Sequence, residues 1–501
     1  MGRVWQGDWI FNVCGMESYM TLEQLEPKEV FHYFKEICKI PHGSGNVKQI
    51  SDYCVDFAKQ HGLKYRQDES LNVIIWKDGT SGYENSPAVI LQGHIDMVAV
   101  KEEDCTKDME KEGLDLEIQD GYLSAKQTSL GGDDGIAVAY SLALLASTDI
   151  PHPPLEAVFT VDEEIGMLGA AAIDLSDLKG KIMLNMDSED EGIFLAGCAG
   201  GASVRCDIPV TKGTETGVRR TLTLKGFTGG HSGTEIICQR ANTNILMGRI
   251  LMELNNEMSF FVTSISGGEK DNAIAKVGKL ELLIQPSDAQ TFTETMEKIT
   301  ATLKREYEAT DPDMQIVITE DNEEKETLVY HPSCTMKLML ALVHLPYGVV
   351  KMSNDIKGLV QTTLNLGIIQ KTQDCVRLCY SVRSSVGSEK EWLIEKLYSL
   401  TEFLGGSCTI DGPYPAWEYK KDSKLREIIC EVYEELYHEK PLIQTIHAGV
   451  ECGLFSEKIP GLDCISFGPN ILDIHTTNEH LDIASVERTW KLILEVLEKL
   501  K

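Results

Sequence analysis

Apolar and polar positions follow two periods along the first 200 residues, one typical of helices and one of strands. Some segments carry apolar residues at helical spacing, and others are short, almost continuous apolar runs. The expected elements are, in order, helices at 29–40 and 47–62, strands at 71–77 and 87–99, a helix at 133–147, and strands at 152–164 and 180–190. Because strands and helices alternate, this part predicts an α/β layer with a mixed, largely parallel sheet.

The pattern changes near residue 200 and changes back near residue 405. Residues 197–230 are rich in Gly and Thr with alternating strand-like positions, and a charged helix is expected at 288–310. The α/β pattern returns with a helix at 423–438 and a strand at 463–469. The simplest organisation is therefore a catalytic α/β domain interrupted by an inserted α+β domain.

This organisation divides the chain at two points, after residues 200 and 404. The catalytic domain takes residues 1–200 and 405–501, and the inserted domain takes residues 201–404. Met16 and Met20 follow the start closely, so the first fifteen residues are expected to be a disordered tail or a mis-assigned start.

Composition narrows the classes of partner. The chain has 501 residues with 47 basic and 78 acidic side chains, a formal net charge of −31. Such a charge repels phosphate backbones and anionic lipids, so neither nucleic acid nor a membrane surface is an expected partner. The fourteen cysteines include no C-x-x-C pair, which favours free thiols in a reducing cytoplasm. The most apolar stretch, 136–147, is too short to span a bilayer, and no secretory signal is evident at the start.

The candidate chemistry lies where four apolar strands end. Each strand runs into ionisable residues, and a Gly-Gly turn adds two more acids before the helix at 133–147. These residues are His94 and Asp96, Glu163 and Glu164, Asp187, His475, and Asp133 with Asp134. Ligands in open α/β sheets gather at the carboxyl ends of strands, so the side chains are expected to converge. An excess of buried carboxylates requires neutralising cations, which predicts a metal site.

The donor set limits the choice of metal. Imidazoles and carboxylates without thiolates suit zinc, with manganese or cobalt as alternatives. A paired site needs one carboxylate that bridges both ions and holds a water between them. Such a site polarises a carbonyl group, and a neighbouring carboxylate that is not a ligand serves as the base.

Eight short motifs then point to a known family. In chain order they are GHIDMV, LGGDDGI, DEEIGMLGA, NMDSEDEG, GCAGG, GGHSG, HAGVECG and HTTNE. Together they resemble the aminoacylase-like co-catalytic zinc exopeptidases, the family of carboxypeptidase G, and within it the aminoacyl-histidine dipeptidases. The resemblance covers nearly the whole chain after about residue 20. It implies a zinc-exopeptidase-like catalytic domain with an inserted lid domain.

The resemblance also assigns the metal ligands. By analogy with the family, His94, Asp133 and Asp187 hold one zinc ion. Asp133, Glu164 and His475 hold the other, so that Asp133 bridges the two.

Catalytic and substrate-binding roles follow from the same likeness. Asp96 orients His94, and Glu163 is the general base that accepts the proton of the bridging water. The position of Asp187 is Asp in the family's aminopeptidases and dipeptidases and Glu in its carboxypeptidases and acylases. In the lid, His231 resembles the oxyanion-stabilising histidine. Residues that resemble the groups holding the substrate are Asn272, Arg383 and His447, the last with Glu451 close by.

We therefore expect a cytoplasmic dipeptidase with two Zn²⁺ ions, replaceable by Co²⁺ or Mn²⁺, that cleaves unblocked dipeptides and prefers Xaa-His. A small peptide is the expected partner, and pairing of two chains through the lid stays open. The alternatives are a broader aminopeptidase or tripeptidase, an aminoacylase on the same site, and a metal-binding or scaffolding protein without activity. Trp392 and Tyr398 are expected in the core or at a domain contact, and His331, His344 and His480 in structural roles.

Overall fold

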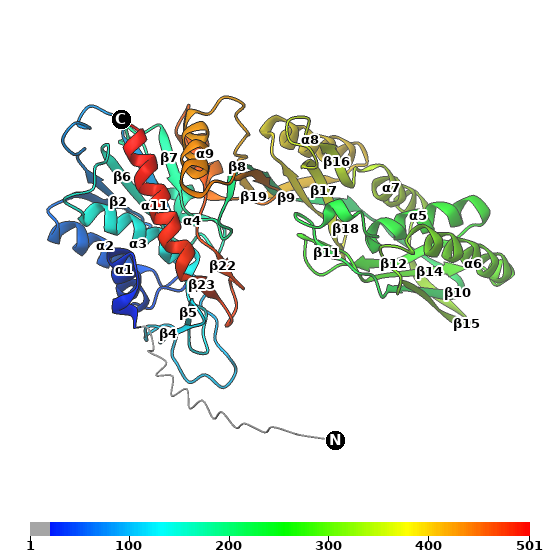
Figure 1. The fold of residues 1–501 in the computed structure, drawn as a ribbon. Coiled ribbons are helices and arrows are strands. Elements are labelled where there is room, and N and C mark those ends of the chain that lie inside the picture. The colour runs from blue at the N-terminus through cyan, green and yellow to red at the C-terminus, as the bar shows by residue number, and fades with distance from the viewer. Residues whose placement is uncertain (1–20) are drawn as a thin grey trace, which may run out of the picture.

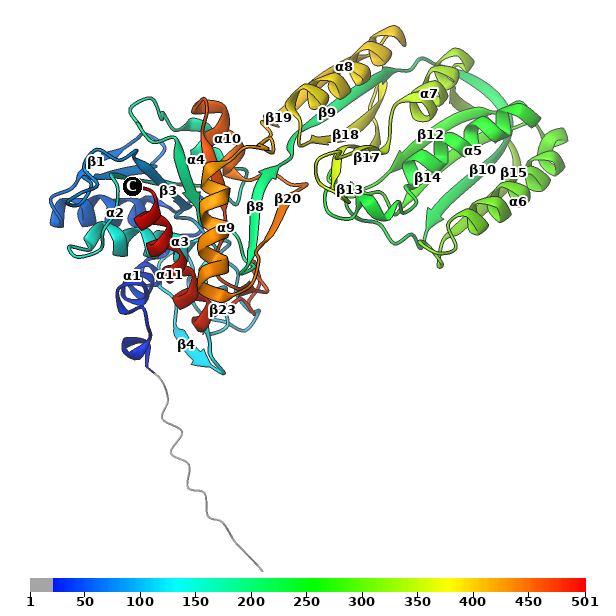
Figure 2. The same cartoon turned by 45° about the horizontal axis from the view of Figure 1, so that its top comes forward.

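The computed structural model describes residues 21–501, which form two bodies, each built around its own β-sheet (Figure 1). The first body contains both chain parts that flank the predicted insertion, and the second contains the predicted lid (Figure 2). The expected tail at residues 1–15 lies outside the described residues.

An eight-stranded sheet forms the centre of the first body. Its strands, in spatial order, are β1 (Lys64–Gln67), β2 (Val73–Lys77), β6 (Leu155–Thr160), β3 (Val89–His94), β7 (Ile182–Asn185), β21 (Asp463–Ser466), β8 (Ile193–Cys198) and β20 (Leu442–Ile446). The four central strands β6, β3, β7 and β21 are parallel to one another. On either side of them, β2 runs antiparallel to β6, and β8 runs antiparallel to β21. The predicted mixed, largely parallel sheet is confirmed.

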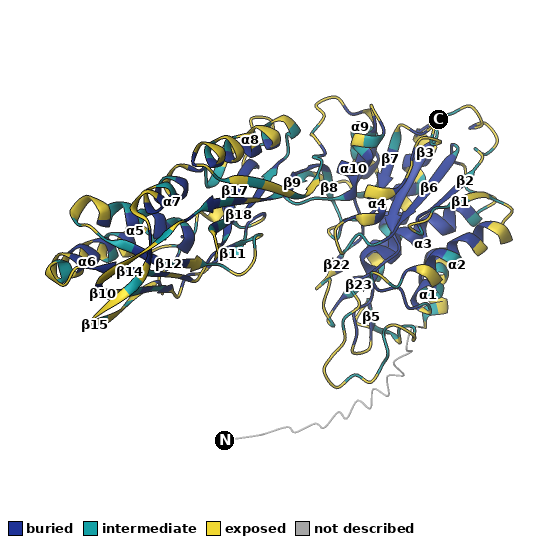
Figure 3. Cartoon of the chain, turned by 180° about the vertical axis from the view of Figure 1, so that it is seen from behind, coloured by how far each residue is buried: buried dark blue, intermediate teal, exposed yellow. Residues whose placement is uncertain are grey.

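Helices cover both faces of this sheet. Val89 and Leu91 enter one hydrophobic core and Ile90 enters another, so both faces of β3 are buried (Figure 3). This explains why the central strands read as continuous apolar runs. On the first face lie α1 (Lys28–Cys38), α2 (Lys48–Gln60), α3 (Gly132–Ala146), α9 (Lys424–Tyr437) and α11 (Ile483–Lys499), and on the second face lie α4 (Leu168–Ala172) and α10 (Glu451–Lys458).

A small antiparallel sheet brings two distant parts of the chain together. Its strands, in spatial order, are β22 (Ile471–Leu472), β23 (His480–Asp482), β5 (Tyr122–Ala125) and β4 (Leu116–Gln119). The pairing of β23 with β5 places the loop of residues 473–479 near the turn that opens α3. His475 lies in this loop.

The lid is an antiparallel sheet with helices on one side. In spatial order its strands are β15 (Gln315–Tyr330), β10 (Lys212–Lys225), β14 (Gly278–Ile284), β12 (Phe261–Gly267), β17 (Val360–Lys371), β18 (Cys375–Ser384), β9 (Gly200–Pro209) and β19 (Ser407–Tyr414), with β16 (Gly348–Met352) beside β17. The sheet thus continues past residue 404, where the sequence analysis ends the lid. A separate pair is formed by β11 (Gly230–His231) and β13 (Ala273–Ile274).

Four long helices pack against the lid sheet around one core: α5 (Thr243–Glu257), α6 (Ala289–Glu306), α7 (Pro332–His344) and α8 (Gly387–Phe403). Within residues 21–501 the short 3-10 helices are η1 (Leu22–Gln24) before α1, and η2 (Ile236–Cys238) and η3 (Pro286–Asp288) in the lid. The placement of Trp392 and Tyr398 in a core is wrong, because they are 60% and 40% exposed. The α8 residues in the lid core are Leu393, Ile394 and Leu397. Over residues 21–501, no helix is both long and apolar enough to cross a membrane.

Two adjacent chain segments connect the bodies. β8 continues into β9 on the way to the lid, and β19 leads back toward Trp417. The backbones of Cys198 and Trp417 exchange two hydrogen bonds, and Gly201 pairs with Tyr414 farther on. The outgoing and returning segments therefore run side by side where they leave one body for the other.

Candidate metal centre

Three parallel strands end at the same edge of the sheet and deliver most of the predicted residues there. His94 is the last residue of β3, Glu163 and Glu164 follow β6, and Asp187 follows β7. The register of β3 with β6 sets His94 opposite Thr160. Because parallel strands present their carboxyl ends together, these side chains converge as predicted.

Asp133 reaches the same edge from the turn that opens α3. Gly131 has φ +67°, and a Cβ there would lie 2.8 Å from the sulfur of Met97. The first glycine of the LGGDDGI motif is therefore required by both conformation and space. Asp133 itself is buried beneath this turn.

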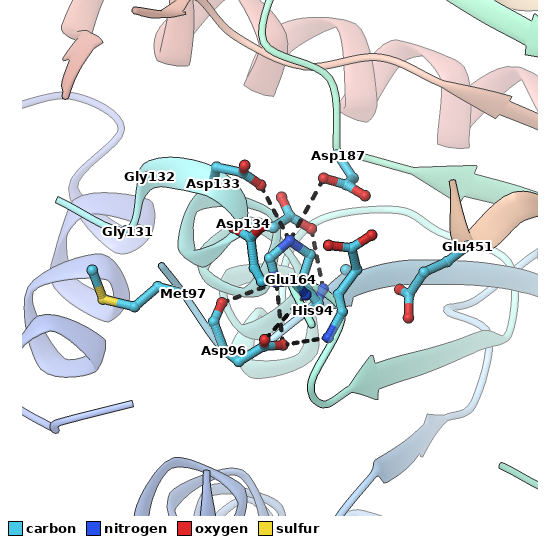
Figure 4. A network of polar contacts seen from close by, with 12 residues as sticks. His94, Asp96, Met97, Gly131, Gly132, Asp133, Asp134, Glu164, Asp187 and Glu451 are labelled. Atoms are coloured by element: carbon cyan, nitrogen blue, oxygen red, sulfur yellow. Dashed lines mark hydrogen bonds and ion pairs between the residues drawn. The ribbon is translucent and has the colours of Figure 1, made fainter. Parts of the chain in front are cut away.

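The two carboxylate oxygens of Asp133 face two different histidines, of which Figure 4 labels His94. Oδ1 lies 3.1 Å from Nε2 of His94, and Oδ2 lies 3.1 Å from Nε2 of His475. Asp187 approaches the same nitrogen of His94 at 3.7 Å, and Glu164 approaches His475 at 2.9 Å. The five side chains thus form two groups whose potential ligand atoms lie within 4.8 Å of one another, with Asp133 in both.

Negative charge exceeds positive charge in this cluster. Burial, reinforced by neighbouring carboxylates, raises the pKa of Glu163 to about 8 and raises that of Asp187 well above its usual value. Among residues 21–501, the ion pairs of these ligand carboxylates are with His94 and His475, and no Lys or Arg takes part. Buried carboxylates that lack basic partners are neutralised well by divalent cations. The donor set therefore fits metal ions.

Asp96 organises the residues around His94. Nδ1 of His94 donates a hydrogen bond to the backbone oxygen of Asp96 at 2.9 Å, and the Asp96 carboxylate lies 3.5 Å away. This leaves Nε2 as the free ligand nitrogen, directed toward Asp133. The Asp96 carboxylate also accepts the backbone N–H groups of Glu163 at 3.0 Å and Glu164 at 3.4 Å. It consequently fixes the turn that carries both glutamates.

Asp162, the first of the three acids after β6, stabilises a turn. Asp162 adopts φ +55°, and its carboxylate accepts the backbone N–H of Gly45 at 2.7 Å. It belongs to neither ligand group. Of three adjacent acids, one stabilises a turn, one is a candidate ligand and Glu163 is left as a candidate base.

The residues predicted to contact the substrate form a second cluster, with His231, Asn272 and Arg383 from the lid and His447 from the first body. His231 and Asn272 line one cavity of about 480 Å³. Arg383 donates to the hydroxyl of Tyr414 at 3.2 Å, and a 2.7 Å hydrogen bond joins His447 to Thr363. Burial and the nearby Arg383 lower the pKa of His231, and the same causes lower that of His447 to about 4.

The structure does not join the two clusters directly. In the described part of the chain, no hydrogen bond or ion pair links His231, Asn272 or Arg383 to the five candidate ligands. The segment from His447 to Glu451 lies between them. Its Glu451 is fully buried and accepts hydrogen bonds from Thr160 on β6 and Gln92 on β3.

Sequence reasoning missed several residues of this region. They are Thr363, Tyr414 and Glu479, together with the buried contacts of Glu451. The HAGVECG and HTTNE motifs contain the two glutamates, so the signal was present for these alone.

The fold and the paired ligand groups define a metal-dependent peptidase. Residues 90–499 match the family described as Peptidase family M20/M25/M40, and the chain belongs to this family. The resemblance drawn from the eight motifs is thereby confirmed, as is the prediction of a hydrolase that acts on peptide bonds.

Individual relatives agree over nearly the full length. The chain is 34% identical to the cytosol non-specific dipeptidase of Escherichia coli (strain K12), over 96% of this chain and 99% of the relative. The crystal structure of aminoacylhistidine dipeptidase from Vibrio alginolyticus superposes with a TM-score of 0.90 at 35% identity, covering 96% and 98% of the two chains. Aminopeptidase PepT from Bacillus cereus, at 14% identity and a TM-score of 0.55 over 95% and 99%, shares the fold.

Proposed function

We propose that this protein is a dinuclear metallo-dipeptidase that hydrolyses unblocked dipeptides and prefers Xaa-His. The observation that supports this most is the sharing of Asp133 between two groups of candidate ligands. The names of the relatives from E. coli and V. alginolyticus support the substrate class.

Zinc is the proposed metal at both positions, with Co²⁺ or Mn²⁺ as substitutes. Two imidazoles and three carboxylates without a thiolate suit these ions. His94 and Asp187 would hold one ion, His475 and Glu164 the other, and Asp133 both. When bound, such a pair polarises the scissile carbonyl and supplies a nucleophile near neutral pH.

Glu163 is the proposed general base. It is adjacent to a candidate ligand but belongs to neither ligand group. Its backbone is fixed by Asp96. Because its carboxylate is not a candidate ligand, it is available to accept a proton and to pass it to the leaving amine.

The lid residues are proposed to bind the rest of the dipeptide. Nδ1 of His231 accepts the backbone N–H of Gly233 at 3.3 Å, which leaves its Nε2–H free to stabilise charge on the scissile carbonyl oxygen. Arg383 can donate to the terminal carboxylate as a planar fork, with Asn272 on the peptide backbone. His447, which is hydrogen-bonded to Thr363, is proposed to contact the substrate as well, and closure of the lid would exclude water.

A substrate panel combined with metal analysis tests this function. The substrates are Ala-His, Ala-Ala, Ala-Ala-His and N-acetyl-Ala, each measured with the metal content of the same preparation. Fastest turnover of Ala-His supports the proposal. Faster cleavage of Ala-Ala-His indicates a tripeptidase, and faster cleavage of N-acetyl-Ala indicates an aminoacylase. Bound metal without any hydrolysis indicates a binding protein.

The cytoplasm is the proposed location, and the name of the E. coli relative supports it. Pairing of two chains stays a prediction, and the exposed face of α8 is where we place it. Trp392 and Phe403 are 60% and 84% exposed there. Sedimentation of the protein and of its Phe403→Ser variant tests this placement, because a dimer held by this face would dissociate.

A further inference from the structure

A single buried carboxylate gathers the backbone of the turn that carries Asp133. Glu479 is 2% exposed. Its Oε2 accepts the N–H groups of Leu130 at 2.8 Å and Gly131 at 3.0 Å. Its Oε1 accepts those of Gly132 at 2.8 Å and Asp133 at 3.4 Å. Four consecutive backbone N–H groups thus point at one side chain.

Glu479 connects this turn to the loop of the second histidine. It lies in the same loop as His475, between β22 and β23. Its backbone N–H donates to the carbonyl of Thr476 at 3.3 Å, which tightens the loop. The two side chains that meet at 3.1 Å, His475 and Asp133, are therefore carried by two segments that Glu479 ties together.

The carboxylate of Glu479 is committed to this contact. It belongs to neither ligand group, and within residues 21–501 it forms no ion pair with Lys, Arg or His. Convergent backbone N–H groups form a concave site that stabilises a negative charge. A Cβ on Gly132 would lie 3.3 Å from Oε1 of Glu479, so the turn is fitted closely to the carboxylate.

We propose that Glu479 is a positioning residue. It holds Asp133 and His475 at the separation needed to bind the metal ion of the group that these two residues form with Glu164. The inference deepens the proposed function, and its kinetic part rests on that function. Its metal-binding part does not require peptide hydrolysis. A glutamine at this position would keep one acceptor oxygen but turn an NH₂ group toward backbone N–H donors, so half of the contact would become repulsive.

Glu156 offers a matched control. It is 3% exposed and lies on β6, near the opposite end of the strand from Glu163. Its carboxylate accepts the backbone N–H groups of Lys179 at 2.9 and 3.1 Å and of Gly180 at 2.9 Å. Glu156→Gln therefore damages a similar buried clamp away from the metal centre.

The experiment compares Glu479→Gln, Glu156→Gln and the unmodified full-length chain. Thermal unfolding with a chelator measures the metal-free fold, and competition with a chromogenic chelator measures Zn²⁺ affinity. The absorption spectrum with Co²⁺ reports the geometry of the bound ions. Both variants should unfold at lower temperature. Glu479→Gln alone should weaken one of two metal equivalents, by about 10- to 100-fold, the usual effect of changing a group that supports a ligand.

The Co²⁺ spectrum at saturation should also change in Glu479→Gln alone, and kcat for Ala-His should fall with little change in KM. Unaltered affinity and spectrum in Glu479→Gln, or equal weakening in Glu156→Gln, would overturn the proposal. If Glu479→Gln does not fold, Glu479→Asp, which keeps the charge but has a shorter reach, takes its place with the same readouts. A wild-type protein that binds two metals without cleaving dipeptides would remove the proposed function and leave this inference in place.

Discussion

The two histidine clusters of this molecule differ in the sign of the charge around them. At the edge of the eight-stranded sheet, hydrogen bonds to Asp133 and Glu164 raise the pKa of His475 to about 10. Near the lid, burial and Arg383 lower the pKa of His447 to about 4. The pKa of a histidine thus shifts in opposite directions in the two clusters, upward where carboxylates accept its hydrogen bonds and downward where burial and a nearby guanidinium disfavour its positive charge. The first cluster is suited to cations, and the second to the negative charge of a substrate.

The largest effect is expected from removing the carboxylate that both ligand groups share. Asp133→Ala should lose both metal equivalents and all measurable hydrolysis, whereas His475→Ala should chiefly weaken one equivalent. Elemental analysis of the purified proteins measures this directly. Retention of two equivalents by Asp133→Ala would exclude the bridging role.

Asp162→Ala is the matched control for this prediction. Asp162 follows β6, as the candidate ligand Glu164 does, but it accepts a hydrogen bond from Gly45 and belongs to neither ligand group. The variant should keep its full metal content. Loss of metal from it would show that the total charge of the cluster, rather than the specific groups, determines binding.

The next largest effect separates metal binding from proton transfer. Glu163→Gln preserves the shape of the side chain and removes its proton acceptor. Turnover of Ala-His should fall by about 10²- to 10⁴-fold, the usual contribution of a general base, while metal content stays constant. Steady-state kinetics and elemental analysis on one preparation are sufficient. Wild-type turnover would assign the base to another group.

The lid cluster is expected to act on kcat through His231. His231→Ala should lower kcat by about 10²- to 10³-fold, as for other lost oxyanion donors, without changing metal content. His331→Ala is the control, because His331 is an exposed lid histidine that caps α7. Its kcat should equal that of the wild type. An undiminished kcat in His231→Ala would reduce the lid to a cover.

The smallest effect concerns the substrate carboxylate. Arg383→Lys removes the planar fork, so KM for Ala-His should rise roughly tenfold, the size of one charge-assisted hydrogen bond. The preference for Ala-His over its amide should shrink as well. Arg377→Lys, on the same strand but paired with Asp207, should leave both unchanged. Equal hydrolysis of acid and amide by the wild type would contradict this role of Arg383.

Much of the metal centre could be predicted from sequence because its ligands follow regular elements. His94 ends a buried apolar strand, Glu164 and Asp187 follow such strands closely, and parallel strands bring these positions together whatever the details of the loops. The expected helices at 29–40 and 423–438 appear as α1 (Lys28–Cys38) and α9 (Lys424–Tyr437). Local periodicity is sufficient for elements of this kind.

Other contacts could not be predicted because they depend on three-dimensional packing between distant segments. Glu479 binds a turn about 350 residues earlier in the chain, and Thr363 meets His447 only because the lid lies against that loop. The prediction that Trp392 lies in a core was wrong for a related reason. Helical spacing shows that residues share a face, but which face packs against the sheet depends on how α8 is rotated, and that face carries Leu393, Ile394 and Leu397.

The paired crossing between the two bodies has a mechanical consequence. The outgoing and returning strands are paired with each other at Cys198 and Trp417 and at Gly201 and Tyr414, so any bend at this crossing would have to move both strands together. Gly200 permits this contact, because a Cβ there would lie 2.5 Å from the backbone nitrogen of Ala416. Because His231 and Arg383 both belong to the lid, such a bend would move them together and keep the distance between them unchanged. A bulky residue at position 200 would disrupt the contact between the two strands, so that each could bend separately.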